Sequence, residues 1–563
     1  MTTISSSTSS TSTTSSASSV TTSGTTTSAS LDWSTLIQAA VDAKLARATT
    51  IAATITSNEA KIVAYQALQT SLSTMASDLK SLATAVINTL ATNAFATRAA
   101  TITSSGDVSA SSALSMSVSN GAAIGDHTLT ISQIATAHKV VGTSQSSQTD
   151  ALGCSGVFAL GLEGGSAVDI TVTDTMSLLD VVDAINAQTT TTHVQASIVQ
   201  ITSDSYVMVL TATEDAADIT YSSSADADIL YNLGVTDSSG SFSNVLQTAQ
   251  PAIFALDGIA MTRDTNDITD VLAGVTFNLL QATPSGTSLR IGIATDTSQI
   301  ASAIETFVAD YNSFRDAVIA QQATNSDGTA SSGAVLFGDG TVRDVMNQLQ
   351  SALNSTVGGL TMADLGLSFN EKNELELDTG TLYKILSTNL AGVTKLLSAQ
   401  TTTSSSQLTV VNTGTSPQSF VLDLEVDASG SLTAASVNGD SSLFTVSGKT
   451  IIGNAGTIYS GMAFTYSGST SQSITVTSTS GLATQLYQIA KTYSASSGSF
   501  QMLISNLQSR DDELQQKVND IQSAASAYQA QLQAQYAKYQ AAIQSANNTL
   551  TYLKVLLNAG SSN

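Results

Sequence analysis

The stretch FALDGIAMTRDTNDITDVLAGVTFNLL, from Phe254 to Leu280, consists of an acidic segment between two apolar runs. Asp264, Asp267 and Asp270 lie in its middle, so a cation site is one interpretation. The segment lacks the central glycine and terminal glutamate of a calcium loop, however. Asp and Asn side chains also form local turns through hydrogen bonds to the backbone. We therefore interpret the acidic segment as turns between strands and expect no metal site.

On both sides of this stretch, apolar residues alternate with polar ones, which is typical of strands with one buried face. In DHTLTISQ, Leu129 and Ile131 alternate with threonine, and SAVDITV repeats the pattern. SLLDVVDAINAQ, from Ser177, has instead the spacing of a short helix. A further β-rich block covers residues 398–480. The middle of the chain is thus predicted to be α+β, with mostly antiparallel sheets.

The two ends of the chain have a helical period instead. LDWSTLIQAAVDAKLARA, from Leu31, predicts a first helix, and apolar residues then recur at alternating spacings of three and four. TSQIASAIETFVADYNSFRDAVIAQQ repeats this spacing further along the chain. Leu503 to Leu557 hold the same period without glycine or proline. Such stripes are typical of coiled coils.

The last helix has an unusual outer face, because Lys538 and Lys554 are the only charged residues after Asp520. Coiled coils usually carry Glu and Lys on their flanks, so this helix is expected to be covered on more than one side. Antiparallel pairing of the terminal helices within one molecule and packing against other subunits both remain open. The candidate positions for contact with another subunit or a partner are Leu68, Leu72, Met75, Leu79, Leu532, Tyr539, Ile543, Leu550 and Leu553.

Composition restricts the possible functions. At 563 residues the chain exceeds the size of one hydrophobic core, so several domains are expected. Asp and Glu outnumber Lys and Arg by 43 to 19, the net charge is -24, and no basic run occurs. Nucleic-acid binding is therefore not expected, because it needs a basic surface. No apolar run reaches the length of about 18 residues that spans a bilayer, so membrane insertion is not expected either.

Motifs for catalysis, metals or cofactors are missing. Cys154 is the only cysteine, and the three histidines lie in separate segments without ligand spacing. SGKT, at Ser447 to Thr450, resembles the end of a phosphate-binding loop, but Leu443 stands where that loop needs its first glycine. We therefore predict a protein that is not an enzyme and has no catalytic residues, metal ligands or cofactor.

The N-terminal segment differs from the rest of the chain. Residues 1–30 contain 24 Ser or Thr and no charged residue. Such a segment cannot bury enough apolar surface to offset the entropy of ordering, so it is predicted to be disordered. It lacks the basic and apolar regions of a secretory signal peptide, so export would need another route.

Several segments, taken in order, resemble the flagellar hook-associated protein 2 family of filament-capping proteins. The stretch from Phe254 to Leu280, followed by SLRIGIATDTSQI and FVADYNSF, resembles the central signature of the family. LDWSTLIQAAVDAKLARA, GDHTLTISQIATAHKVVG and ADLGLSFNEKNELELDTGTLYKIL are similar to other family segments. The resemblance covers nearly all of the chain from Leu31 except 398–480.

The resemblance implies an α+β multidomain fold in which terminal coiled-coil-like helices form a leg and stalk, with mostly antiparallel β head domains inserted between them. Asp257 and Gly258 would form a hairpin turn, Gly274 a second turn, and Arg263 and Asn266 belong to the same structural signature. The expected domains are a disordered tail 1–30, leg and stalk 31–105, inner head 106–150 plus 246–295, outer head 151–245, stalk core 296–397, inserted β domain 398–480 and C-terminal stalk and leg 481–563.

The resemblance also implies a function. A ring of identical subunits would cap the distal tip of the flagellar filament, outside the cell, and help exported flagellin to fold and insert. Its partners would be flagellin, hook-filament junction proteins, and the flagellar type III export apparatus with its chaperone, which exports proteins without a cleaved signal peptide. Two alternatives remain: an adhesin that binds glycans or mucin, and another axial component such as a junction protein or flagellin.

Overall fold

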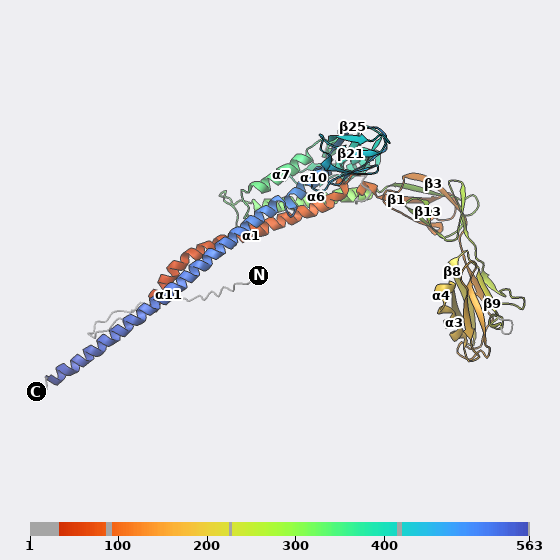
Figure 1. The fold of residues 1–563 in the computed structure, drawn as a ribbon, viewed down its shortest axis with the longest axis horizontal. Coiled ribbons are helices and arrows are strands. Elements are labelled where there is room, and N and C mark those ends of the chain that lie inside the picture. The colour runs from red at the N-terminus through yellow and green to blue at the C-terminus, as the bar shows by residue number, and fades with distance from the viewer. Residues whose placement is uncertain (1–32, 86–92, 224–227, 414–418, 561–563) are drawn as a thin grey trace. The chain divides into compact units, whose positions relative to one another are not determined.

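The computed structural model describes residues 33–85, 93–223, 228–413 and 419–560, so the predicted disordered tail at 1–30 lies outside the described residues. The chain divides into two compact units, Met1–Val63 with Leu503–Asn563, and Ala64–Met502. Long helices lie at both ends of the described chain and antiparallel sheets in its middle (Figure 1). The predicted α+β fold class is therefore confirmed.

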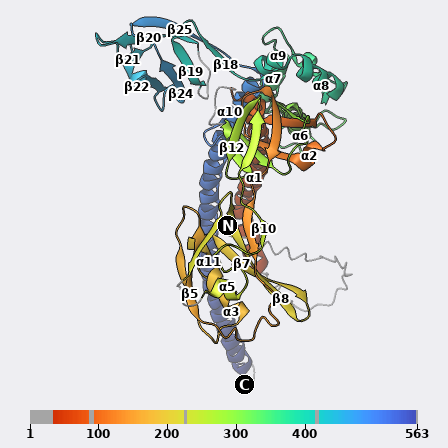
Figure 2. The same ribbon diagram turned by 90° about the vertical axis from the view of Figure 1, so that its right-hand side faces the viewer.

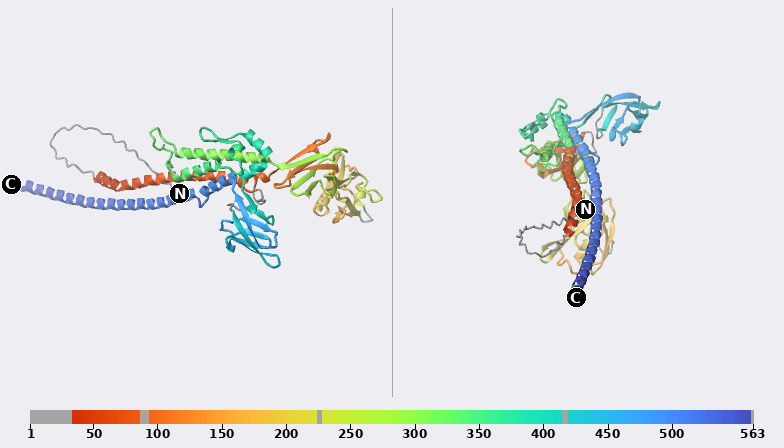
Figure 3. Two further views of the ribbon diagram at one scale, coloured as in Figure 1. Left: turned by 90° about the horizontal axis from the view of Figure 1, so that it is seen from above. Right: turned by 90° about the vertical axis from the view of Figure 1, so that its left-hand side faces the viewer.

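The first unit is a pair of helices formed by the two ends of the chain. It contains the N-terminal part of α1 (Trp33–Ala83) and most of α11 (Ser499–Gly560), which run side by side (Figure 3). The helices are antiparallel, because residue numbers rise on one helix as they fall on the other in three contacts: Trp33–Tyr536, Lys44–Tyr528 and Asn58–Asp511.

The second unit has a helical core built from distant segments. Its elements are the remaining parts of α1 and α11, with η1 (Ala94–Ala96), α6 (Thr297–Gln321), α7 (Gly340–Leu353), η2 (Met362–Leu365), β16 (Leu367–Phe369), β17 (Leu375–Leu377), α8 (Thr379–Thr388), α9 (Leu390–Leu397) and α10 (Leu482–Ser494). The apolar stripe predicted on α6 is buried at Ile300, Ile304, Phe307, Tyr311, Phe314 and Val318.

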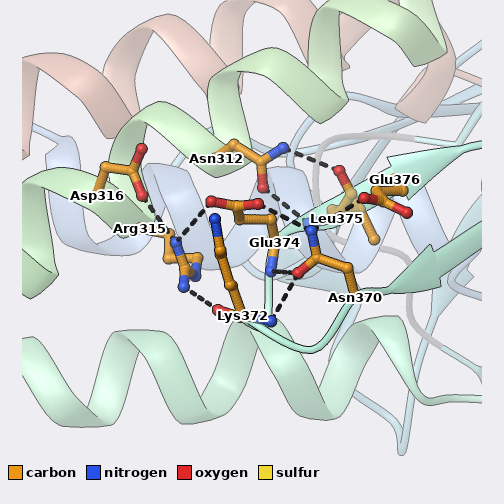
Figure 4. A network of polar contacts seen from close by, with 8 residues as sticks. All are labelled: Asn312, Arg315, Asp316, Asn370, Lys372, Glu374, Leu375 and Glu376. Carbon is orange, nitrogen blue, oxygen red and sulfur yellow. Dashed lines mark hydrogen bonds and ion pairs between the residues drawn. The ribbon is translucent and has the colours of Figure 1, made fainter.

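Polar contacts hold the β16–β17 hairpin against α6 (Figure 4). The Asn312 side chain accepts from the N–H of Leu375 and donates to its C=O, both at 2.8 Å. The buried Arg315 donates to the C=O of Lys372 and, at 2.7 Å, to the Asp316 carboxylate. Asn312 thereby satisfies both backbone groups of the buried Leu375, which would otherwise lose their hydrogen bonds on burial.

The inner head consists of two sheets around a shared core. In one sheet the strand order is β1 (Arg98–Ser104), β15 (Leu289–Thr295), β3 (Gly125–Gln133), β11 (Ala252–Leu256) and β12 (Ile259–Arg263); in the other it is β13 (Asp267–Leu272), β14 (Val275–Leu279) and β2 (Leu114–Val118), and the short helix α2 (Ala110–Ala113) precedes β2. Leu129, Phe254 and Phe277 belong to the core. The apolar runs of the signature stretch thus supply inward-facing side chains.

The outer head also has two sheets. Their orders are β10 (Val245–Gln247), β4 (Ala137–Val141), β8 (Ser205–Asp215) and β7 (Val194–Thr202), and β6 (Val168–Val172), β5 (Gly156–Leu162) and β9 (Ile219–Ser223), accompanied by α3 (Leu178–Asn186), α4 (Thr189–Thr192) and α5 (Ile229–Asn232). Ser177 caps α3 in a capping box with Asp180, and the apolar face of α3 is buried, as its spacing predicts.

Strand pairing corrects three of the expected domain boundaries. Residues 98–104 were assigned to the leg and stalk, but β1 pairs with β15 and so belongs to the inner head. Residues 137–141 and 246–247 are expected in the inner head, but β4 pairs with β8, and β10 pairs with β4, in the outer head. Alternating polarity predicts a strand but not its partner, because partner choice depends on contacts between residues far apart in sequence.

The β-rich block from 398 to 480 has a core of its own. One sheet has the order β18 (Gln400–Thr403), β25 (Gln472–Thr479), β20 (Phe420–Val426) and β21 (Leu432–Ser436); the other has β19 (Leu408–Thr413), β24 (Met462–Tyr466), β23 (Thr450–Gly453) and β22 (Phe444–Ser447), with η3 (Ser441–Leu443) before β22 (Figure 2). Leu422, Phe464 and Val476 lie in the core between the sheets. The SGKT segment forms the turn between β22 and β23, with Gly448 at φ 58°.

A pair of carboxyl groups lies within the helical core. One oxygen of Asp310, on α6, is hidden from solvent and has no hydrogen-bond partner within the described part of the chain. Burial, and then the neighbouring Asp78 carboxyl on α1, raise the pKa of Asp310 to about 6. The protonated form of Asp310 is therefore favoured in the folded protein below about pH 6.

Replacing Asp310 with asparagine is expected to stabilise the helical core at neutral pH. Because the folded pKa is raised, the carboxyl stabilises the fold below pH ~4, and this stabilisation is lost as the pH rises through about 6. We expect a gain of about 1 kcal/mol at pH 8, after allowance for solvent screening, and a smaller gain at pH 4. Thermal unfolding at both pH values, with the exposed Glu305→Gln as control, measures this; equal shifts at the two pH values would contradict it.

Candidate functional site

The C-terminal part of α11 exposes large apolar side chains along its predicted stripe. Tyr539, Ile543, Leu550 and Leu553 are 51% to 60% exposed. Leu532 is half-buried, near the contact between Tyr536 and Trp33 at the start of the described part of α1. From Tyr539 onward the stripe has no covering helix among the described residues of this unit. It is therefore a candidate binding surface.

Further exposed apolar residues lie beside this stripe. Tyr552, Val555 and Leu556 are 52% to 66% exposed, and Leu557 is 72% exposed. Sequence reasoning did not select the first three, because they lie off the three-four spacing. The run TYLKVLLN could have indicated these residues, because it places apolar side chains on several sides of the helix. Such a helix is expected to have contacts on several sides. We call the exposed apolar residues from Tyr539 to Leu557 the C-terminal apolar surface.

Contacts of the C-terminal apolar surface would be mostly apolar. Lys538 and Lys554 are the only charged residues from 521 to 560. A helix segment without Asp or Glu can approach a second acidic chain without strong repulsion, although each copy of this protein carries a net charge of -24. The helix is also long enough to present several turns to a partner.

The four candidate contact residues on α1 require a correction. Leu68, Leu72, Met75 and Leu79 are at most 1% exposed. They pack inside the helical core of their own chain, so they offer no surface to another subunit or to flagellin. A heptad stripe looks the same in sequence whether a helix of the same chain or of another chain covers it.

The signature stretch forms two turns. Asp257 and Gly258 connect β11 to β12 with φ angles of 52° and 81°, which is the geometry of a tight hairpin turn. The Asp257 carboxylate accepts from the N–H of Thr128 at 2.8 Å and lies 2.7 Å from His127 Nδ1. These contacts, with that of His127 first, lower the pKa of Asp257. Gly274, with φ 76°, forms the second turn, between β13 and β14.

The polar residues between these turns have structural contacts. Arg263 pairs with Asp270 at 3.0 Å, which lowers the pKa of Asp270. Asn266 accepts from the N–H of Ala135 at 2.7 Å and donates to its C=O at 2.9 Å. Asn266 thereby joins the loop before β13 to the segment that leads from β3 to β4. The acidic segment therefore has the role of a connector.

Replacing Asn266 with leucine is expected to destabilise the inner head. The N–H and C=O of the buried Ala135 would both lose their partner, at a cost of about 2 kcal/mol or more. Hydrogen exchange of the full chain should show faster exchange in β3, β13 and β14, and little change in the helical core. Asp267→Asn, an exposed neighbouring change, is the control. Unchanged exchange in the Asn266→Leu variant would contradict the connector role.

Residues 33–85, 93–223, 228–413 and 419–560 contain neither a metal-binding cluster nor a helix that could span a membrane. Within them, no cluster of three or more His, Cys, Asp or Glu is suited to hold a metal ion. None of the described helices is both long and apolar enough to span a membrane.

Family models match most of the chain. The model described as "Flagellar hook-associated protein 2 C-terminus" matches residues 249–548, and the corresponding N-terminus model matches residues 29–138. A model described as "Flagellin hook IN motif" matches residues 157–214, in the outer head. The C-terminal model alone covers more than half of the chain, including the signature stretch and most of α11.

Individual relatives give weaker similarity. Flagellar hook-associated protein 2 of Escherichia coli K12 is 27% identical over 386 residues, which cover 66% of this chain and 78% of that protein. The Helicobacter pylori protein is 27% identical over 148 residues, and the match spans 26% of this chain and 21% of that relative. The crystal structure of domains D1 to D3 of the E. coli flagellar cap protein aligns with a TM-score of 0.47 and 20% identity, covering 79% of this chain and 99% of that one.

Proposed function

This chain belongs to the flagellar hook-associated protein 2 family, and from this premise we propose that it caps the distal tip of the bacterial flagellar filament. As a cap it promotes the folding and insertion of exported flagellin and prevents flagellin from escaping. The family match over residues 249–548 carries the proposal. The cap acts through binding and has no enzymatic activity.

The C-terminal apolar surface supports a role in binding at the filament tip. A ring that moves outward as flagellin is added must bind a surface that changes with every subunit. Apolar contacts are non-directional, so they tolerate such changes better than specific hydrogen bonds do. Each leucine or isoleucine that becomes fully buried contributes about 1.5–3 kcal/mol relative to full exposure. A few such residues are enough for a reversible attachment to flagellin.

The proposed partners follow from the proposed position at the distal tip of the filament. Copies of the chain form a ring and contact flagellin, with hook-filament junction proteins as neighbours before the filament grows. The protein reaches the outside of the cell through the flagellar type III apparatus, with the help of an export chaperone and without a cleaved signal peptide. The uncharged Ser/Thr-rich segment at 1–30 is compatible with that route.

The distribution of flagellin tests the proposed function. In cells that lack this protein, we expect bare hooks and abundant free flagellin in the medium, since exported subunits would diffuse away. Adding the purified protein from outside should restore filament growth. Normal filaments in the deleted strain would contradict the capping function.

A further inference from the structure

The helix pair of the first unit contains a buried polar contact. Asn58, on α1, is only 7% exposed, and its Nδ2 donates to Asp511 Oδ1, on α11, at 2.6 Å. The other carboxylate oxygen of Asp511 is hidden from solvent and has no hydrogen-bond partner among the described residues. The contact joins residues 453 positions apart in sequence. We call Asn58 and Asp511 the polar layer.

The polar layer interrupts two apolar stripes at positions that face each other. On α1, Asn58 stands between Ile55 and Ile62 at the spacing of three and four. On α11, Asp511 occupies the corresponding place in the series Ile504, Leu507, Asp511, Leu514 and Val518. All of the aliphatic residues in these two stripes are buried or half-buried. Both helices therefore place a polar side chain where the heptad pattern calls for an apolar one.

A buried polar contact in a coiled coil reduces stability but restricts pairing. In the native register the Asn58 amide gives the Asp511 carboxylate a hydrogen bond. A shift by one heptad would place the carboxylate opposite Ile51 or Tyr65 of α1. Ile51 has no donor, which makes burial of the carboxylate costly, and the hydroxyl of Tyr65 already donates to Asp339. Pairing between the α11 helices of two copies would place it opposite either an apolar residue or a second carboxylate. Only α1 in the native register satisfies Asp511.

We propose that the Asn58–Asp511 polar layer determines the partner and register of α11: it favours α1 in the native register over shifted registers and over the α11 helix of a second copy. A polar layer is needed because apolar heptads of similar spacing discriminate little between partner helices and between registers. The capping proposal brings identical copies close together, so their α11 helices could pair with each other. The inference on pairing itself does not depend on capping.

Disulfide trapping in the full-length chain tests this proposal. With Cys154→Ser as background, Ile55→Cys and Leu514→Cys form a probe pair, since Asn58 faces Asp511 and the helices are antiparallel. Chains that carry only Leu514→Cys report pairing between the α11 helices of two copies, whereas one chain that carries both cysteines reports native pairing. The probes are then combined with Asn58→Leu and Asp511→Leu. The control is Ile51→Leu with Val518→Leu, which changes the stripes but keeps the polar layer.

With the polar layer intact, and in the control, we expect cross-links mainly within chains. The double leucine variant should increase cross-linking between chains about tenfold, which corresponds to about 1.4 kcal/mol of lost discrimination. Asp511→Asn should behave as the parent protein, because an amide pair can still form hydrogen bonds. Cross-linking of the double leucine variant only within chains would overturn the proposal. Because this readout is independent of flagellin, it separates failure of the pairing rule from failure of the capping function.

Discussion

Replacing Leu550, Leu553 and Leu557 with serine should release flagellin into the medium while leaving the folded domains as stable as before. The three side chains are 51% to 72% exposed, so their loss removes almost no contact within the chain. If a partner buries the exposed part of each side chain, each replacement forfeits about 1–2 kcal/mol of attachment, and three together weaken binding about a hundredfold or more. Free and filament-bound flagellin, measured by immunoblot in the complemented strain, give the result.

The control for this prediction lies on the same helix. Ala541, Gln544 and Thr551 are exposed and lie off the apolar stripe. Their replacement with serine matches the test variant in the number of changes and in the helix that carries them. We expect normal filaments from this control. Equal flagellin loss in both variants would indicate that the changes damage the helix itself. Normal filaments from the variant that lacks the three leucines would show that the C-terminal apolar surface does not bind flagellin.

Leu72→Ala should have the opposite pattern, with a large loss of stability. Leu72 is 0% exposed within the helical core. Replacing a buried leucine with alanine leaves a cavity and costs about 2–5 kcal/mol. The chain has several domains and need not unfold in one step, so hydrogen exchange in α1, α6 and α10 is the appropriate measurement.

The exposed Val63 provides the comparison for Leu72. Val63 is 64% exposed, so Val63→Ala should cost less than about 0.5 kcal/mol. If Leu72→Ala instead leaves exchange unchanged and impairs only flagellin capture, Leu72 acts as a contact residue and its assignment to the core is wrong.

Sequence patterns predicted the type of most elements because the periods of helices and strands differ. The stripe on α6 and the apolar face of α3 are buried as expected. The patterns did not predict which strands pair, so β1 and β4 were assigned to the wrong domains. Pairing depends on contacts between distant segments, which a single sequence does not display.

Sequence patterns also did not predict which residues of the candidate site are exposed. The same spacing of apolar residues occurs at Leu72, which is buried, and at Leu553, which is half-exposed. What separates them is the presence of a covering helix from the same chain, and that follows only from the fold. Asn58 and Asp511 carried a weak signal, as polar residues at apolar positions, but their contact required the register of α1 against α11.

The most direct test of the capping account is a photo-cross-link from the C-terminal apolar surface in growing filaments. A photoreactive amino acid at position 553 should form an adduct with flagellin at the filament tip, whereas the same residue at the exposed position 544 should form far less. Such an adduct would show that the exposed stripe is covered by the protein that the cap inserts. Filaments that grow normally with no adduct between position 553 and flagellin would contradict the account.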